Sequence, residues 1–191
     1  MEAQRFSGKN SRFESEISLW SQSVLSFWFE ETSPRQWFRQ SNQFDWLVTR
    51  RFAELSVEAQ RGGLFNWEKD SSSCLALVLI LDQFSRQIWR DSVLAYEGDA
   101  RALRLSQWAL KQGWIASEPE RARRQFWLMP MLHSESVAVV TKAIPLLERF
   151  ADSDTADLAR RNRITLNRNG YYPWRDAVRR CWLMSTLEGL N

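Results

Sequence analysis

The stretch CLALVLIL, from Cys74 to Leu81, is the longest apolar run in the chain, and the polar sequence DQFSRQIWR, Asp82 to Arg90, follows it directly. A membrane-spanning helix needs about 20 apolar residues, so a run of this length predicts a core helix and no membrane partner. Because its first half is apolar on every side, we expect this helix to lie at the centre of a helical bundle.

Apolar residues recur at three- and four-residue spacing on both sides of this run, which predicts further amphipathic helices. The turn residues and caps between them set the expected bounds. We expect a first helix over about 17–31, stopped by Thr32–Pro34, and a second over 42–61, closed by Gly62–Gly63. The central helix should span 74–89, with a serine among 71–73 as its cap. Further helices are expected over 99–112, from Pro119 to just before Pro130, from a Ser134 cap to Phe150, over 154–168 and over 174–182.

Together these segments predict an all-α fold, with one domain over residues 1–191 and about seven to nine helices. The connections are short, so neighbouring helices should pack as antiparallel hairpins. Residues 1–13 are polar and are expected to form a frayed tail, and Ser185 and Glu188 have the spacing of a capping box. No strict 34-residue repeat occurs.

The composition is that of a globular protein, with 44% hydrophobic and 26% charged residues. The N-terminus lacks a secretory pattern and the two cysteines lie far apart, so we expect a reducing cytoplasm. One histidine and two distant cysteines do not make a standard zinc site, and no P-loop, dinucleotide fingerprint or G-x-S-x-G motif occurs. We therefore expect no metal and no cofactor.

The polar end of the central helix is the first candidate for function. Asp82, Arg86 and Arg90 recur every four residues and so share one helical stripe, with Gln83 beside it. A buried carboxylate needs a partner, and Arg86 is the nearest. The stripe is either an internal salt bridge or the wall of a polar pocket.

The single histidine is the second candidate. We expect His133 just before a helix and Glu135 in its first turn. A histidine that a carboxylate orients can act as a general base, but a histidine bonded to the backbone is the commoner case.

A third candidate is the segment Arg160–Trp182, which is rich in arginine and aromatic residues. Basic side chains beside stacking rings suit nucleic acid. The alternative is a set of ion pairs with the acidic residues Asp152, Asp154 and Asp157 and with other helices.

Several of these segments resemble a bacterial family called domain of unknown function 924. They are VLSFWF (24–29), LALVLILDQFSRQIWR (75–90), Asp99-Ala100 and LHSE (132–135), and the resemblance covers about residues 24–188. It implies an all-helical fold similar to tetratricopeptide-repeat proteins and no established activity. The positions that match include Asp82, Gln83, Arg86, Arg90, His133, Glu135 and Arg175.

The chain departs from the pattern of this family at positions where the resemblance implies proline, asparagine and histidine. Ser85 and Gln87 stand for the proline and asparagine of its P-R-N segment, and Asn162 and Trp174 stand at two positions of histidine. Of three implied histidines only His133 is present. A histidine cluster for metal binding or acid–base work would therefore be lost in this chain.

Three hypotheses for function follow. The first is a non-enzymatic module that binds a protein or peptide in a groove between helices, since Trp and Arg dominate binding hot spots and the chain has 11 Trp and 22 Arg. The second is a small-molecule-binding protein or hydrolase, in which Asp82 or Glu135 orients His133 and Arg86 or Arg175 holds an anion. The third is nucleic-acid binding through the C-terminal arginines.

Overall fold

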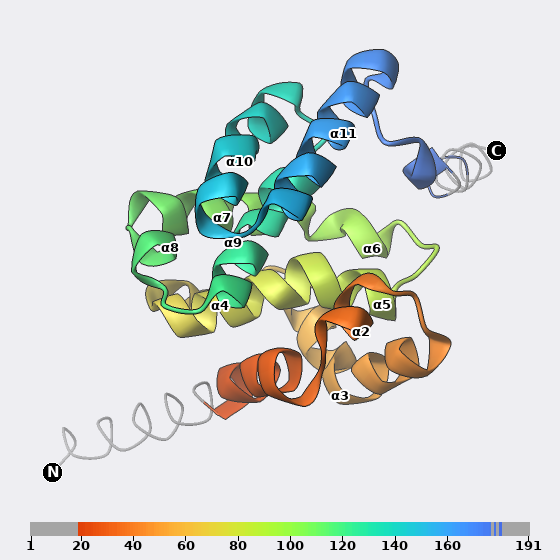
Figure 1. Cartoon of the computed structure of the whole chain (residues 1–191). Coiled ribbons are helices and arrows are strands. Elements are labelled where there is room, and N and C mark those ends of the chain that lie inside the picture. Colours follow the sequence, from red (N-terminus) through yellow and green to blue (C-terminus); the bar gives the residue numbers. More distant parts are fainter. Residues whose placement is uncertain (1–18, 177, 179, 181–191) are drawn as a thin grey trace, which may run out of the picture.

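The central helix predicted from the apolar run organises the fold. The computed structural model describes residues 19–176, 178 and 180, and every regular element in this part of the chain is helical. The central rod consists of α4 (Ser71–Leu79), a π-helical turn η3 (Ile80–Phe84) and α5 (Ser85–Ile88). Figure 1 shows it crossing the middle of the molecule, between the N-terminal and the C-terminal helices.

Every residue of this rod from 73 to 85 is buried, which confirms its expected place in the core. Aromatic rings from the N-terminal segments pack on its end: the ring centroids of Phe84 and Phe52 lie 4.9 Å apart, and those of Phe84 and Trp28 5.3 Å. The predicted serine cap is wrong. Asp70 is the N-cap, and its carboxylate accepts a hydrogen bond from the Ser73 amide at 3.0 Å.

The N-terminal elements cover one side of the rod. Residues 19–26 are helical and continue into the π-helical turn η1 (Phe27–Glu31). The long helix α3 (Asn42–Gln60) packs against η3 and α5. The sequence did not predict a helix at Pro34, yet proline suits a first helical turn, and Ser33 and Gln36 form a capping box there. The elements after η1 are α2 (Pro34–Phe38), α3 (Asn42–Gln60) and the 3₁₀ turn η2 (Phe65–Lys69).

The C-terminal elements cover the other side. Helix α9 packs against α4 and α7, and α10 packs between α9 and α11, so successive helices lie side by side (Figure 1). The elements are α6 (Leu94–Glu97), α7 (Asp99–Lys111), α8 (Trp114–Ser117), α9 (Arg121–His133), α10 (Val137–Phe150), α11 (Ser153–Asn169) and the 3₁₀ turn η4 (Pro173–Arg175).

The predicted end of one helix and the predicted start of the next were wrong, and both errors change the expected position of the histidine. Helix α9 does not end before Pro130 but continues to His133, and Ser136, not Ser134, is the N-cap of α10. A proline inside a helix removes one hydrogen bond at a cost of about 3 kcal/mol. Residues 125–132 are all buried, and their packing offsets that cost. His133 is therefore the last residue of a packed helix.

Some of the remaining predictions fall on described residues, and others fall outside them. The helix ends at Gly62, Gly113 and Gly170 are confirmed, and all three glycines have positive φ. The tail 1–13, the capping box at 185–188 and the helix end at Trp182 lie outside the described residues. Within the described part of the chain, no helix is long and apolar enough to cross a membrane.

Candidate functional site

His133 and Asp82 form the centre of the candidate site. His133 Nδ1 lies 2.8 Å from Oδ1 and 3.0 Å from Oδ2 of the Asp82 carboxylate, which is only 1% exposed. Asp82 belongs to the π-helical turn η3, a type of irregularity that is frequent at functional sites. An ionised carboxylate can only accept, so Nδ1 carries the proton. The other ring nitrogen, Nε2, is then free to accept one.

The Asp82 carboxylate is held in its charged form. Burial would raise its pKa, but the charges of His133 and Arg86 and the hydrogen bonds from His133 and Gln83 bring the pKa well below its ordinary value. Gln83 Nε2 donates to Oδ2 at 2.5 Å, and Arg86 Nη2 lies 3.4 Å from Oδ1. Arg86 also donates to the carbonyl oxygen of Asp82.

A second carboxylate, Asp99, joins two arginines behind the histidine. Arg86 Nη2 donates to both of its oxygens, at 3.0 and 3.1 Å, and Arg175 Nη1 lies 3.0 Å from Oδ2. Burial raises the pKa of Asp99, and the charges of both arginines oppose that rise. Asp99 is the first residue of α7, so this helix end fixes the position of both guanidinium groups.

Arg175 is the most constrained of the arginines. Its Nη2 donates to the carbonyl oxygen of His133 at 2.9 Å, and its guanidinium carbon lies 4.4 Å from the centre of the Tyr96 ring. Its Nε is buried and has no hydrogen-bond partner among the described residues.

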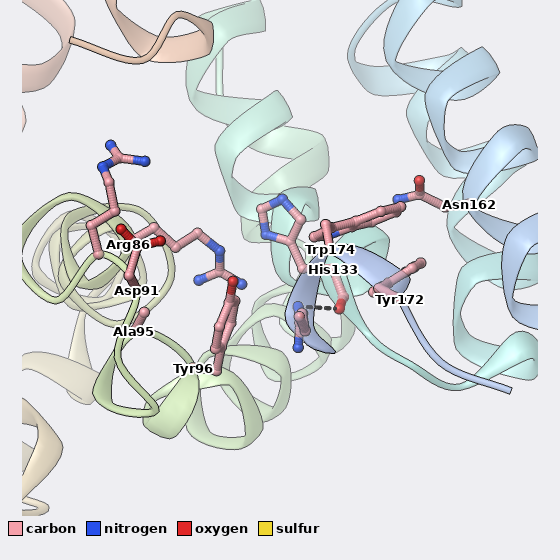
Figure 2. A pocket seen from close by; sticks show the side chains of 10 residues that line it. Arg86, Asp91, Ala95, Tyr96, His133, Asn162, Tyr172 and Trp174 are labelled. Carbon is pink, nitrogen blue, oxygen red and sulfur yellow. Dashed lines mark hydrogen bonds between the residues drawn. The ribbon is translucent and has the colours of Figure 1, made fainter. Parts of the chain in front are cut away.

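A pocket of about 300 Å³ opens at these residues. Figure 2 shows the imidazole of His133 between Arg86 and Tyr96 on one side and Tyr172 and Asn162 on the other. The lining consists of Arg86, Arg90, Asp91, Ala95, Tyr96, His133, Asn162, Tyr172, Trp174 and Arg175.

A second pocket of about 350 Å³ shares three lining residues with the first, His133, Arg86 and Arg90. The rest of its lining differs in character, with four glutamines, a methionine, a leucine and three aromatic residues. Those residues are Gln36, Gln40, Gln83, Gln87, Met129, Leu158, Trp37, Phe38 and Phe44, and two charged residues, Arg39 and Asp45, complete the lining.

The structure brings most of the predicted site residues together. Asp82, Gln83, Arg86, His133 and Arg175 are joined by the contacts above. Arg90 lines both pockets, but its partner is not on the predicted stripe. Its guanidinium forms two hydrogen bonds of 2.7 Å with Asp45 of α3. Asp99 was not predicted as a site residue, although it occurs in the segments that carry the resemblance.

The prediction for Glu135 was wrong in position. It lies in the loop before Ser136, not in the first turn of α10, because α9 continues to His133. Glu135 Oε1 accepts a hydrogen bond from the Tyr172 amide at 2.8 Å. Asp82, the other predicted partner of the histidine, makes the contact with the imidazole.

The two positions of missing histidine lie at the same pocket as His133. Asn162 donates from Nδ2 to the carbonyl oxygen of Leu132 at 3.2 Å. Trp174 stacks on Tyr172, with ring centroids 4.6 Å apart and an interplanar angle of 14°. All three positions of histidine that the resemblance implies therefore converge on one cavity.

Arg160 and Arg175 are two arginines of the C-terminal segment that have internal partners. Arg160 forms ion pairs with Asp157, at 2.5 Å, and with Glu148, and Arg175 belongs to the site described above. Arg179 and Trp182 lie outside the described residues. Nucleic-acid binding by this segment stays a prediction. In the described part of the chain, no group of three His, Cys, Asp or Glu side chains is placed to hold a metal ion.

Comparison with known proteins finds one matching family and a similar solved structure. The model of a family described as "Bacterial protein of unknown function (DUF924)" matches residues 24–180. A solved structure of a protein of unknown function from Agrobacterium tumefaciens is similar, with 27% sequence identity and a TM-score of 0.78. The similarity covers 84% of this chain and 90% of that protein. No curated protein matches the chain at a significant level.

Proposed function

The chain belongs to the bacterial family DUF924, and we propose that it binds a small anionic molecule beside His133 and that the Asp82–His133 pair transfers a proton during its hydrolysis. The observation that carries this proposal is the 2.8 Å contact between Nδ1 and the buried Asp82 carboxylate, at the wall of a pocket. A carboxylate in this position fixes the tautomer that leaves Nε2 basic, as in hydrolases with an Asp–His pair.

The charge of the lining favours an anionic ligand. Three guanidinium groups line the first pocket against one carboxylate, Asp91, while Asp82 and Asp99 lie behind the arginines and the histidine and not on its lining. Arginine is suited to a carboxylate or phosphate group because its donors form a planar fork.

Water is the nucleophile that the lining supports. None of the ten residues around the first pocket is a serine, threonine or cysteine. In the proposed step a water molecule gives its proton to His133 Nε2 while its oxygen bonds to the electrophilic carbon or phosphorus of the ligand. His133 then returns the proton to the leaving group as that bond breaks. General acid–base catalysis of this kind contributes about 10²–10⁴ to a rate.

An activated anionic ester tests the proposal. The probe p-nitrophenyl succinate carries one carboxylate and one ester, and its hydrolysis releases coloured p-nitrophenol. We expect the wild type to accelerate this release, and His133→Asn to lower kcat/KM by about 100-fold or more. Arg175→Lys should raise KM, because it keeps the charge and loses the fork.

The matched control is Arg160→Gln, which removes an arginine that does not line either pocket at the histidine. It should leave both kinetic parameters unchanged. Circular dichroism and thermal unfolding of each variant separate loss of function from loss of fold. A wild-type rate no higher than that of His133→Asn would reject the hydrolytic role.

Binding of a peptide partner is the second candidate function. A third pocket of about 460 Å³ is lined by Trp37, Phe38 and Leu158, among others, and two of these side chains are exposed, Phe38 by 56% and Leu158 by 37%. Exposed aromatic and leucine side chains in a groove suit a helical peptide. Phe38→Asp should abolish retention of any specific partner in pull-downs, and an unchanged set of bound proteins would contradict this candidate.

A further inference from the structure

The last turn of α9 carries His133, and the short segment 172–175 holds this turn from outside the helix. We infer that Tyr172, together with Glu135, is a positioning residue: it fixes the end of α9 so that the imidazole of His133 meets the Asp82 carboxylate. This inference rests on the proposed function, in which His133 transfers the proton, and it names residues that act through the histidine.

The end of α9 depends on partners from outside the helix. The last four carbonyl groups of an α-helix have no amide partner within it. Helix α11 ends at Gly170, whose left-handed backbone, with φ 77°, lets its amide donate back to the carbonyl oxygen of Leu166. Ser134, which follows α9, instead has extended dihedrals of φ −62° and ψ 138°. The last carbonyl groups of α9 are therefore left for side chains from elsewhere in the fold.

Two side chains of the segment 172–175 reach these carbonyl groups. The Tyr172 hydroxyl oxygen lies 3.0 Å from the carbonyl oxygens of both Leu132 and Ser134, so its single hydrogen is shared between them. Arg175 Nη2 donates to the carbonyl oxygen of His133 at 2.9 Å, the dashed line in Figure 2. Three consecutive carbonyl groups are thus within hydrogen-bond distance of one short segment.

Glu135 fixes Tyr172 at its other end. Glu135 Oε1 accepts a hydrogen bond from the Tyr172 amide at 2.8 Å. Tyr172 is only 1% exposed, and burial raises the pKa of its phenol to about 12, so the hydroxyl keeps its hydrogen and donates. Both the hydroxyl and the backbone amide of Tyr172 are therefore bonded to the chain between residues 132 and 135.

A small displacement of this turn would break the contact between the histidine and the carboxylate. Asp82 belongs to η3 in the buried rod, whereas His133 reaches it from the end of a different helix. Nδ1 lies 2.8 Å from Oδ1, and a hydrogen bond to oxygen extends to about 3.2 Å. A shift of about 0.5 Å at the end of α9 therefore suffices to weaken this contact, and a misplacement of about 1 Å can cost about 100-fold in rate.

Tyr172→Phe tests the inference, because it removes the hydroxyl and keeps the ring. The chain has one histidine, so ¹⁵N NMR of the full chain without ligand reports on this imidazole alone. We expect the preference for the Nδ1–H tautomer to fall by about tenfold, since a hydrogen bond to a charged group is worth at least about that factor. In hydrolysis of p-nitrophenyl succinate, kcat should fall about tenfold and KM should stay within about twofold, because the arginines of the pocket are unchanged.

Glu135→Ala is a second variant, and its side chain lines neither pocket at the histidine. It releases the Tyr172 amide and should change the tautomer preference and kcat in the same direction as Tyr172→Phe. This variant decides the question by itself if Tyr172→Phe does not fold, as judged by circular dichroism.

Ser106→Ala is the matched control. Ser106 Oγ donates to the carbonyl oxygen of Trp127 at 2.5 Å, so this bond also joins a buried hydroxyl to a carbonyl group of α9. Trp127 lies more than one turn before His133. Ser106→Ala should lower the urea midpoint about as much as Tyr172→Phe and should leave the tautomer and kcat unchanged. A purely structural role of the Tyr172 hydroxyl predicts that the two variants behave alike, and that result would overturn the inference.

The remaining outcomes separate the inference from the proposed function. An unchanged tautomer and kcat in both Tyr172→Phe and Glu135→Ala overturn the inference and leave the proposed hydrolysis in place. If the wild type does not hydrolyse the ester but Tyr172→Phe still loses its preference for Nδ1–H, the proposed function fails and the positioning of the imidazole is supported. A wild type without the Nδ1–H tautomer overturns the inference together with the contact on which it depends.

Discussion

Replacing Asp82 by asparagine tests the electrostatic arrangement of the site through its effect on stability. The carboxylate is 1% exposed, contacts His133 Nδ1 and Gln83 Nε2, and lies 3.4 Å from Arg86. An asparagine side chain has the same shape, but it offers one acceptor oxygen and turns an NH₂ group toward a donor. At least one hydrogen bond to a charged group is therefore lost.

A hydrogen bond to a charged group contributes about 1.5–3 kcal/mol, and Arg86 keeps Asp99 as its other partner. We expect Asp82→Asn to lower the free energy of unfolding by about 2–4 kcal/mol at pH 7. That is a large part of the 5–15 kcal/mol typical of a domain, yet it leaves the variant folded. Urea unfolding followed by tryptophan fluorescence measures it directly.

The pH dependence gives a second measurement of the same effect. Since the pKa of Asp82 is lower in the folded chain than in the unfolded one, its contribution is fully present above the unfolded pKa of about 4. It is lost as the pH falls from there toward the folded pKa. The difference in stability between wild type and Asp82→Asn should therefore shrink between about pH 4 and pH 2.5.

The control is Glu31→Gln, which removes one partner of an exposed ion pair with Arg51. Surface pairs contribute about 0–1 kcal/mol, so this variant should unfold close to the wild type. A loss below about 0.5 kcal/mol for Asp82→Asn at pH 7, or a loss that stays constant down to pH 2.5, would refute the account of the buried carboxylate.

Three further predictions concern tautomer, packing and reactivity. The chain has one histidine, so ¹⁵N NMR of the neutral imidazole should show a protonated Nδ1 and an unprotonated Nε2, and the opposite tautomer would contradict the contact with the carboxylate. Gly98→Ala should destabilise the fold by about 1–3 kcal/mol in urea unfolding, because the new Cβ would lie 2.7 Å from the carbonyl oxygen of Leu81. An unchanged unfolding midpoint would show that the backbone segments at Gly98 and Leu81 can move apart at no cost. Burial raises the pKa of Cys74 to about 12. In a Cys181→Ser background, a disulfide reagent at pH 8 should therefore label the Cys74 thiol only after the chain unfolds. Rapid labelling of the folded chain would show that the thiol is not buried.

The fold was largely predictable because local signals dominate it. The apolar run before Asp82 set the central helix, and the glycines at 62, 113 and 170 ended three helices where expected. The errors came from residues whose effect depends on packing. Pro130 was read as a helix end, but the buried residues around it hold α9 together. The predicted stop at Thr32–Pro34 is confirmed, since η1 ends at Glu31, but the sequence did not predict that Pro34 begins the short helix α2.

The sequence predicted most residues of the site, but fewer of the contacts between them. Spacing within one helix placed Asp82 beside Arg86, because residues four apart share a face. Partners that are distant in sequence follow from tertiary packing, and spacing alone does not reveal them. Arg86 thus binds Asp99 more closely than Asp82, and Arg90 binds Asp45. The choice between Asp82 and Glu135 as the partner of His133 depended on where α9 ends.

The convergence of Asn162, Trp174 and His133 on one pocket has a consequence for the proposed reaction. Amide and indole side chains are not basic near neutral pH, so the imidazole is the only group of the three that can act as a base. Burial raises the pKa of the Tyr172 phenol to about 12, so this phenol stays protonated near neutral pH. In a pocket with several histidines, a second imidazole could take over part of the proton transfer. Here it cannot, and His133→Asn should lower hydrolysis of p-nitrophenyl succinate to the rate without protein. A residual rate above about one tenth of the wild type, with the fold intact, would mean that another group in the pocket carries the proton.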